Sequence, residues 1–193
     1  MTLKHDKILI VDIEATCWEN NENPPGIINE IIEVGACLLD THSLELSDKS
    51  SILVRPEFSF ISPFCTQLTS ITPEMVERDG VSFADACAMI EQRYQSRGRL
   101  WVSWGNYDRK MFQAQCKVRD IRYPFSDHHM NARKVFGYWM NDKRQIGMAQ
   151  AFEKLELPLE GTHHRGDDDA WNIGRLLQVV LKTHGIGVLA KYW

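Results

Sequence analysis

Two acids at the end of an apolar stretch are the first residues whose types and spacing suit chemistry. Asp12 and Glu14 flank Ile13, just after the apolar run 8–11. The period of two in a strand puts both acids on one face and Ile13 on the other. Alternating acids are also typical of a strand that ends in solvent. By itself, the pair is therefore weak evidence for a metal site or for proton transfer.

Asp108 is the second acid whose position indicates an inward direction. It lies near the start of a helix that follows the apolar strand pattern 99–104. An acid in a first helical turn is ordinary, because it favours the helix dipole. However, Asp108 precedes Met111 and Phe112 by three and four residues, which turns it toward the core side. A carboxylate there needs a counter-charge.

Three successive acids begin the helix predicted over 167–183. At about 100° per residue, Asp169 falls within the apolar stripe that contains Ile173 and Leu176. Asp167 and Asp168 project to the two flanks of that stripe, where they favour the helix dipole and contact solvent. Asp169 is therefore the acid expected to face inward.

Together these positions predict four inward-facing carboxylates and a nearby histidine. Four carboxylates cannot share a dry site as anions without cations, because like charges repel strongly in a low dielectric. Oxygen ligands suit Mg²⁺ or Mn²⁺. Zinc is not expected, since the adjacent histidines 163 and 164 lack the spacing of ligands on one helix face.

The elements that must position these acids follow from periodicity and turn signals, which predict an α/β or α+β domain with a mixed sheet. The short gap at 40–43 indicates a hairpin, and Gly185 is placed to end the last helix. Strands are predicted over 7–14, 27–39, 44–55 and 99–104, with a short one before 131. Helices are predicted from 73, from 83, and over 107–118, 131–139, 145–155 and 167–183.

Length and composition restrict the class of protein. With 193 residues, 44% of them hydrophobic, the chain is expected to form one domain over 1–193. No apolar run has the roughly 20 residues of a membrane helix, and the N-terminus does not resemble a signal peptide, so we expect a cytoplasmic protein without a membrane partner. The five cysteines are scattered and are expected to be small core residues. A net charge of −4 argues against coating long nucleic acid.

Three motifs in a fixed order carry a family resemblance. The chain resembles the 3′→5′ exonucleases of the DEDDh type, in the ribonuclease-H-like superfamily, and within them the ERI-1 / histone-mRNA 3′-exonuclease branch. The similarity covers about residues 7–182. The motifs are Asp12-Ile13-Glu14-Ala15-Thr16-Cys17, Trp104-Gly105-Asn106-Tyr107-Asp108 and His164-Arg165-Gly166-Asp167-Asp168-Asp169.

The resemblance implies a fold and a catalytic centre. The fold would be a ribonuclease-H-like α/β domain, with a mixed five-stranded sheet flanked by helices and the first motif on the central strand. Two Mg²⁺ or Mn²⁺ ions would be held by four acids, and a histidine would be the general base. The metal ligands would be Asp12, Glu14, Asp108 and Asp169, and the catalytic residues Glu14 and His164.

The resemblance also implies contacts to the terminal nucleotide. Glu14, Ala15 and His164 would lie against it. Leu68, Trp104 and Met111 are candidate apolar walls for its base, with core packing as the alternative for these three. Arg109, Lys110 and Arg165 are candidates for phosphate contacts, with solvated surface as the alternative.

Two positions depart from the family pattern, and one histidine competes with the expected base. Asp167 stands where the branch usually has an apolar residue, and Asn106 stands where an acid is common. His163 is the rival base, but its spacing to Asp169 is one residue longer than that of His164.

The implied function is 3′→5′ hydrolysis of RNA, with DNA as a further substrate, to nucleoside 5′-monophosphates. The expected partner is single-stranded or 3′-overhanging RNA. Two alternatives stay open: a proofreading or repair exonuclease that acts on DNA, and a non-catalytic nucleic-acid-binding protein of the same fold. The physiological substrate, the oligomeric state and the protein partners do not follow from the sequence.

Overall fold

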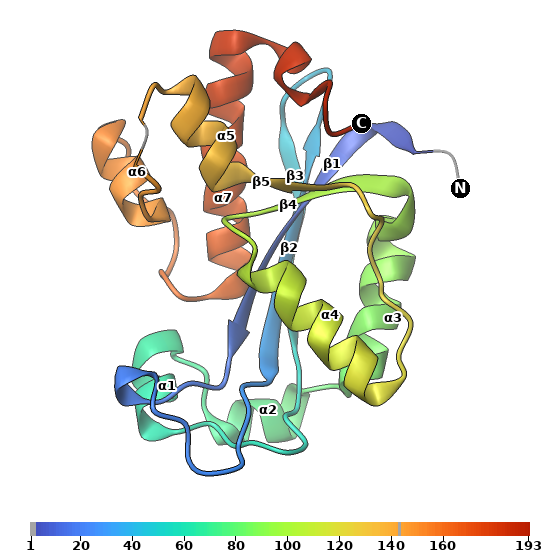
Figure 1. Ribbon diagram of the computed structural model, residues 1–193, viewed down its shortest axis with the longest axis vertical. Coiled ribbons are helices and arrows are strands. Elements are labelled where there is room, and N and C mark those ends of the chain that lie inside the picture. Colours follow the sequence, from blue (N-terminus) through green and yellow to red (C-terminus); the bar gives the residue numbers. More distant parts are fainter. Residues whose placement is uncertain (1–2, 143) are drawn as a thin grey trace.

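A mixed sheet of five strands organises the chain. Figure 1 shows the computed structural model, which describes residues 3–142 and 144–193. The strand order is β3-β2-β1-β4-β5, so that β1 lies at the centre. The five strands are β1 (Lys4–Ala15), β2 (Ile31–Asp40), β3 (Leu46–Leu53), β4 (Arg99–Ser103) and β5 (His129–Asn131).

Antiparallel and parallel pairs occur together in this sheet. β1 pairs antiparallel with β2, and β2 pairs antiparallel with β3, which is the hairpin expected from the short gap between them. β4 runs parallel to β1, and β5 runs parallel to β4. The mixed five-stranded sheet with Asp12 and Glu14 on its central strand is therefore confirmed.

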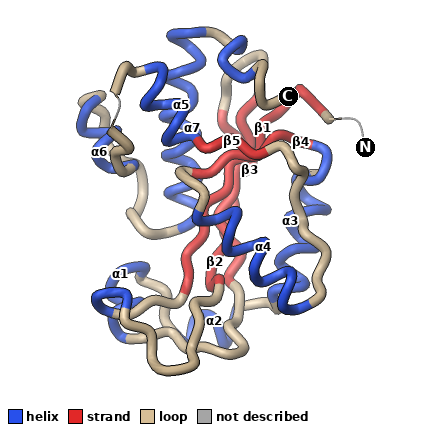
Figure 2. Tube along the Cα trace, in the orientation of Figure 1, coloured by secondary structure: helices blue, strands red, loops and turns tan. Residues whose placement is uncertain are grey.

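Helices cover both faces of this sheet, as Figures 1 and 2 show. Among the described residues, seven α-helices are accompanied by three short 3-10 helices. These helices are α1 (Pro63–Thr69), α2 (Pro73–Asp79), α3 (Phe83–Tyr94), α4 (Tyr107–Arg119), α5 (Ala132–Trp139), α6 (Met148–Lys154), α7 (Gly166–His184), η1 (Glu19–Asn21), η2 (Ser96–Gly98) and η3 (Ile186–Leu189).

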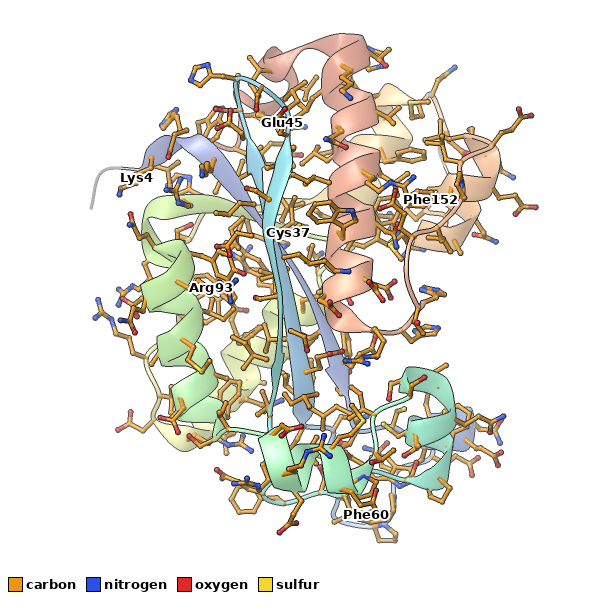
Figure 3. The ribbon with its side chains drawn as sticks, turned by 180° about the vertical axis from the view of Figure 1, so that it is seen from behind. Lys4, Cys37, Glu45, Phe60, Arg93 and Phe152 are labelled. Carbon is orange, nitrogen blue, oxygen red and sulfur yellow. The ribbon has the colours of Figure 1, made fainter. Side chains whose placement is uncertain are left out.

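Alternation along β1 divides the interior into two cores. Ile8 and Ile10 pack into the core formed with α5, α6 and α7. Leu9 and Val11 pack into the opposite core, which α3 and α4 cover. Figure 3 shows the two layers from behind, with Phe152 of α6 on one side of the sheet and Arg93 of α3 on the other. Since the period is two, Asp12 and Glu14 must extend from the face of β1 that α7 covers.

Helix α7 lies unusually close to β2, and two glycines make this possible. A Cβ atom on Gly35 would lie 1.8 Å from the carbonyl carbon of Gly166, a distance that excludes any side chain. The first turn of α7 is thereby placed directly over the sheet. Gly185 ends the helix with φ of 78°, as the sequence predicts.

The structure differs from the sequence prediction at one helix and at several element ends. Helix α1 was not predicted, although Ser62-Pro63 carries a usual start signal: the Ser62 hydroxyl accepts a hydrogen bond from Cys65 N at 3.0 Å. α1 and α2 enclose a small third core at the end of the sheet where β1 finishes (Figure 1). β2 begins at Ile31 and α6 at Met148, in both cases later than predicted.

The structure also shows the state of the cysteines and whether any helix could span a membrane. All five cysteines are free thiols, and four of them are buried, as expected for small core residues. Within residues 3–142 and 144–193, no helix is long and apolar enough to cross a membrane. The single-domain organisation over 1–193 and the cytoplasmic location stay predictions.

Candidate active site

Strand β1 delivers two carboxylates to the end of the sheet. Asp12 lies opposite Gly35 of β2, and Glu14 lies opposite Glu33. Glu14 is only 8% exposed, and Asp12 is half-buried. One carboxylate oxygen from each of Asp12, Glu14 and Asp169 lies within 4.8 Å of the other two. The two acids that share a strand face thus meet a third acid from a distant part of the chain.

Asp108 reaches the same region from the start of α4. Gly105, with φ of 137°, makes the turn that leads from β4 into this helix. The Asp108 side chain accepts a hydrogen bond from Ile13 N at 3.2 Å and is 5% exposed. The predicted inward direction is therefore confirmed. Asp108 lies beside the cluster of three carboxylates rather than within it.

Asp169 enters from the first turn of α7 and is held by the loop that precedes it. It is 5% exposed, which confirms that it faces inward. The backbone N–H of His164 donates to Asp169 Oδ2 at 2.9 Å. His163 Nδ1 pairs with the same carboxylate, at 3.0 Å from Oδ1 and 3.1 Å from Oδ2. The loop and the helix that it enters are thus tied together at the proposed metal ligand.

One expectation about the two histidines is wrong. His163 was expected to lie one residue out of register with Asp169, yet its ring contacts that carboxylate directly. The reason is the backbone of His164, whose φ of 65° is left-handed and turns two successive side chains to the same side. The rings stack, with centroids 4.0 Å apart and planes at 22°. His164 Nδ1 lies 4.0 Å from Glu14 Oε1.

These side chains line one cavity of about 250 Å³. Trp104, a candidate wall for the terminal base, lines it, and so do two residues that were not candidates for the site, Tyr107 and Met148. Tyr107 is 53% exposed and sits one position before Asp108, which was a usable signal for an aromatic side chain near the site. The lining residues are Asp12, Ile13, Glu14, Trp104, Tyr107, Asp108, Met148, His163, His164 and Asp169.

Three of the proposed nucleotide contacts lie outside this lining. Met111 packs against the core between β1 and α4, in agreement with the core-packing alternative. Leu68 is 38% exposed on α1, and Ala15 is buried at the end of β1. Contacts of these residues with a nucleotide stay predictions.

Comparisons with known proteins identify the family. A family model described as "Exonuclease" matches residues 9–177. The chain belongs to this exonuclease family. The exonuclease is 34% identical over 181 residues to 3′-5′ exoribonuclease 1 of Homo sapiens, and 26% identical over 176 residues to the probable 3′-5′ exonuclease KapD of Bacillus subtilis. The alignments cover 89% and 91% of this chain, and 51% and 84% of those proteins. The chain thus spans about half the length of the human relative.

A solved structure supports the assignment at the level of the fold. The crystal structure of the nuclease domain of 3′hExo, a DEDDh family member bound to rAMP, superposes with a TM-score of 0.80 at 31% identity. The superposition covers 95% of this exonuclease and 96% of that chain. The predicted resemblance to DEDDh exonucleases of the ERI-1 branch and the ribonuclease-H-like fold are confirmed, and enzymes of this family depend on divalent metal ions.

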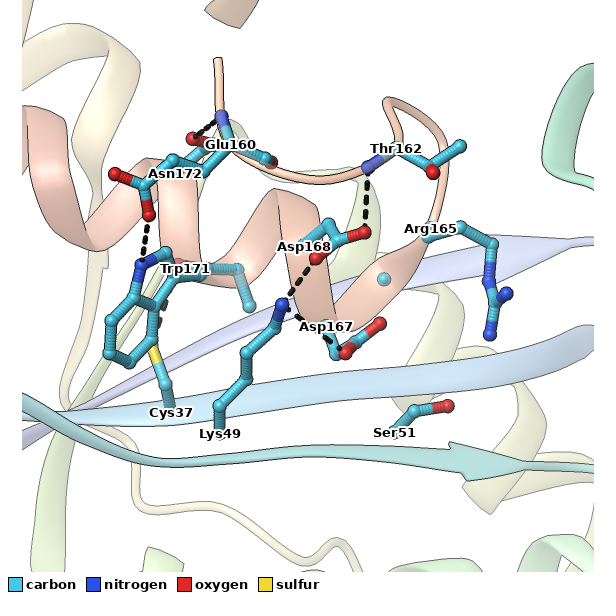
Figure 4. Close-up of polar contacts among 12 residues, drawn as sticks. Cys37, Lys49, Ser51, Glu160, Thr162, Arg165, Asp167, Asp168, Trp171 and Asn172 are labelled. Atoms are coloured by element: carbon cyan, nitrogen blue, oxygen red, sulfur yellow. Dashed lines mark hydrogen bonds and ion pairs between the residues drawn. The ribbon is translucent and has the colours of Figure 1, made fainter. Parts of the chain in front are cut away.

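Polar contacts stabilise the loop before α7, which carries His163 and His164 in this exonuclease (Figure 4). Asp168 accepts a hydrogen bond from Thr162 N at 2.7 Å, and Lys49 of β3 forms an ion pair with it. Asp167 lies 3.5 Å from the same ammonium group. The acid at position 167, which departs from the family pattern, therefore joins α7 to β3 through Lys49. Gly161 fits against the Asp168 carboxylate, where a Cβ atom would lie about 2 Å away.

A second group of polar contacts joins the start of α7 to β2. Glu33 is fully buried and accepts hydrogen bonds from Arg165 Nη2 and Gly166 N, both at 2.7 Å, and from Ser51 Oγ at 2.6 Å. The Arg165 guanidinium is thus engaged inside the protein. Glu33 holds it against the sheet, and the Arg165 side chain stays 24% exposed, so a phosphate contact at this residue stays a prediction.

Asn106, the other departure from the family pattern, precedes the first turn of α4. Its Oδ1 accepts a hydrogen bond from Asn131 Nδ2 at 3.3 Å. This contact joins the start of α4 to the end of β5, and Asn106 does not line the cavity.

Burial shifts the pKa values of all four site carboxyl groups upward, and repulsion by acidic neighbours raises those of Asp12 and Glu14 further. Burial is the main cause for each, and it raises the pKa of Glu14 to about 8 and that of Asp108 to about 6. The pKa of Asp12 is raised well above its usual range by burial and then by Asp108, and that of Asp169 is also raised by burial. Four carboxylates whose negative charges are unfavourable when buried together would be stabilised by divalent cations, and their oxygen atoms suit Mg²⁺ or Mn²⁺.

The histidines differ in the proton chemistry available to them. Burial, and then the neighbouring His163, lower the pKa of His164. The His164 ring is therefore neutral at neutral pH and able to accept a proton. The His163 ring, in contrast, is engaged with Asp169 through Nδ1.

The raised carboxyl pKa values predict how stability depends on pH in the absence of metal. Between the ordinary pKa of Glu14, 4.5, and its value in the fold, about 8, the folded state binds more protons than the unfolded state. The free energy of unfolding therefore falls as pH rises through this window. We expect the melting temperature in chelator to decrease from about pH 5 to about pH 8, and added Mg²⁺ to remove most of that decrease.

The control for this measurement is Glu14→Gln, which has no proton to release at this position. Its melting temperature in chelator should change less over the same pH range than that of the wild type. A wild-type melting temperature that rises with pH in chelator would contradict the assignment of raised pKa values to these acids.

Proposed function

We propose that the protein is a 3′→5′ exoribonuclease that releases nucleoside 5′-monophosphates with the help of two Mg²⁺ or Mn²⁺ ions. The observation that carries this proposal is the cluster of Asp12, Glu14 and Asp169, with Asp108 and an unengaged histidine ring on the same cavity. The human relative, a 3′-5′ exoribonuclease, supports RNA as the substrate. Single-stranded or 3′-overhanging RNA is the proposed partner.

Each side chain has a separate task in this proposal. Asp12, Glu14, Asp108 and Asp169 would hold the ions, which polarise the scissile phosphate and favour ionisation of the attacking water. His164 takes the proton of that water as general base. Its backbone N–H, bonded to Asp169, keeps the loop in place while the ring stays free.

The terminal base is proposed to stack on an aromatic side chain at the rim of the cavity. Tyr107 is half exposed there, and its phenol is uncharged at neutral pH, since partial burial raises its pKa from the ordinary 10 to about 12. Trp104 lies deeper, packed partly against the core of α5. Tyr107 is therefore the better placed of the two for stacking.

Replacement of Tyr107 by alanine should weaken substrate binding. Stacking of one base on an aromatic ring is worth about 1–3 kcal/mol, so KM should rise by about fivefold to 150-fold. Tyr107→Phe keeps the ring and should leave KM within about twofold of the wild type. Steady-state kinetics on a short RNA measures both, and an unchanged KM for Tyr107→Ala would remove this residue from the substrate site.

The direction and the substrate class are tested with end-blocked oligonucleotides. A 3′-phosphate adds charge and bulk beside Glu14 and should slow hydrolysis strongly, whereas a block at the 5′ end should have little effect. The same sequence as RNA and as DNA, each labelled at its 5′ end, gives the preference in one gel. Release of the labelled 5′ nucleotide as the first product would contradict the direction, and faster hydrolysis of DNA would favour the DNA-directed alternative.

A further inference from the structure

A second set of metal donors overlaps the carboxylate cluster but differs from it in chemistry. His163, His164 and Asp169 each offer a ligand atom, and these three atoms lie within 4.8 Å of one another. Two of the donors are imidazole nitrogens. The set exists because the left-handed backbone at His164 brings two adjacent rings together, which the spacing of helix ligands did not anticipate.

The donor types favour a different ion from the one that the carboxylates favour. Imidazole nitrogen suits Zn²⁺, whereas carboxylate oxygen suits Mg²⁺ and Mn²⁺, and Zn²⁺ binds mixed nitrogen and oxygen sites more tightly than Mn²⁺ does. Asp169 has two oxygens, so it can contribute one to each donor set. Its position at the junction couples the two sites.

The geometry needs only a modest side-chain movement to enclose an ion. Zinc bonds of about 2.0–2.1 Å in a tetrahedral site place neighbouring ligand atoms about 3.4 Å apart. The rings of His163 and His164 are each 39% exposed, so they can rotate without disturbing the core. The Asp169 carboxylate, in contrast, is held by the loop and supplies a rigid third ligand.

We propose that Zn²⁺ binds to His163, His164 and Asp169 and thereby inhibits the nuclease. Binding occupies a nitrogen of His164, so that this ring no longer accepts a proton, and it takes one oxygen of Asp169 from the carboxylate site. The inhibition rests on the proposed function, whereas the binding does not.

The binding is tested by titration of zinc chloride into the chelator-treated full chain, followed by calorimetry. The variant is His163→Asn, whose amide keeps a hydrogen-bond donor close to the position of Nδ1 but lacks the imidazole ligand. His42→Asn, at an exposed turn between β2 and β3, is the matched control. We expect at least about tenfold weaker zinc binding in His163→Asn and no change in His42→Asn.

A second probe reports the coordination itself. Co²⁺ held by the three protein ligands and one water would be four-coordinate and absorb strongly in the visible, whereas Co²⁺ in a six-coordinate oxygen site absorbs weakly. The wild type should show the strong bands and His163→Asn should lose them. Equal zinc affinity in wild type and His163→Asn, or equally weak cobalt bands in both, would place the ion on the carboxylates and overturn the proposal.

The effect on activity is measured separately, at a fixed Mg²⁺ concentration. The zinc concentration that halves the rate of RNA hydrolysis should rise at least about tenfold in His163→Asn relative to its own zinc-free rate. Zinc bound through His163 in a chain that hydrolyses no RNA would refute the nuclease and the inhibition but leave the zinc site. If the enzyme is active but His163→Asn binds zinc as tightly as the wild type does, the zinc site alone is refuted.

Discussion

Asp12→Asn is expected to remove nearly all turnover and at the same time to raise the melting temperature of the metal-free protein. Asp12 is the acid whose pKa is raised most clearly by burial and by its acidic neighbours. Its removal relieves repulsion in the metal-free fold. In the active enzyme it removes a ligand whose ions supply several kcal/mol of charge stabilisation, which corresponds to a loss of about 10³-fold or more in rate.

Two assays separate these effects. Hydrolysis of a short RNA with saturating Mg²⁺ gives the turnover, and thermal unfolding in chelator gives the stability. Asp120→Asn, at the exposed left-handed end of α4, is the matched control, because asparagine tolerates that backbone as well as aspartate does. It should change neither quantity. Full turnover by Asp12→Asn, or wild-type activity in chelator, would contradict the metal site proposed for these acids.

His164→Ala is expected to slow hydrolysis by about 10²–10⁴-fold, the usual contribution of a general base. The metal ligands stay in place, so binding of Mn²⁺ and of RNA should change little. His163→Ala should have a smaller effect, because it removes one contact to Asp169 and leaves the base. Loss of a single supporting contact of this kind costs about tenfold to 100-fold.

The comparison is decisive because the two residues are adjacent and chemically identical. The rate of the wild type should also fall on acidification as the His164 ring takes up a proton, and this part of the pH profile should be absent in His164→Ala. If His163→Ala were the slower variant and kept no pH-dependent step, His163 would be the base. The assignment of the third motif would then need to be shifted by one residue.

Local periodicity in the sequence was sufficient for much of the fold and for the direction of the acids. Alternation along β1 placed Asp12 and Glu14 on one face of the central strand, and the structure has them on the side of α7. Helical periodicity singled out Asp108 and Asp169 as inward-facing, and both are 5% exposed. These inferences succeeded because a strand or helix sets the direction of a side chain within a few residues.

Contacts between distant segments were decided only by the tertiary structure. Spacing alone could not show that Glu33 engages Arg165 or that Lys49 pairs with the acids of α7, because each contact joins β2 or β3 to a helix far along the chain. Tyr107 was within a recognised motif, yet its place at the rim of the cavity depends on how α4 packs against β1.

The histidine pair shows most clearly where sequence reasoning ends. Counting residues assumed a regular backbone, and on that assumption His164 was better placed than its rival His163 to serve the site of Asp169. The backbone at His164 is left-handed instead, inside a loop that Asp168 and Thr162 hold together, and both rings reach the acids. The residue types and their order determined which chemistry the chain can perform. The direction of each ring was decided by a single loop conformation. Long-range contacts stabilise this loop, so its conformation has no repeating pattern in the sequence, unlike a strand or a helix.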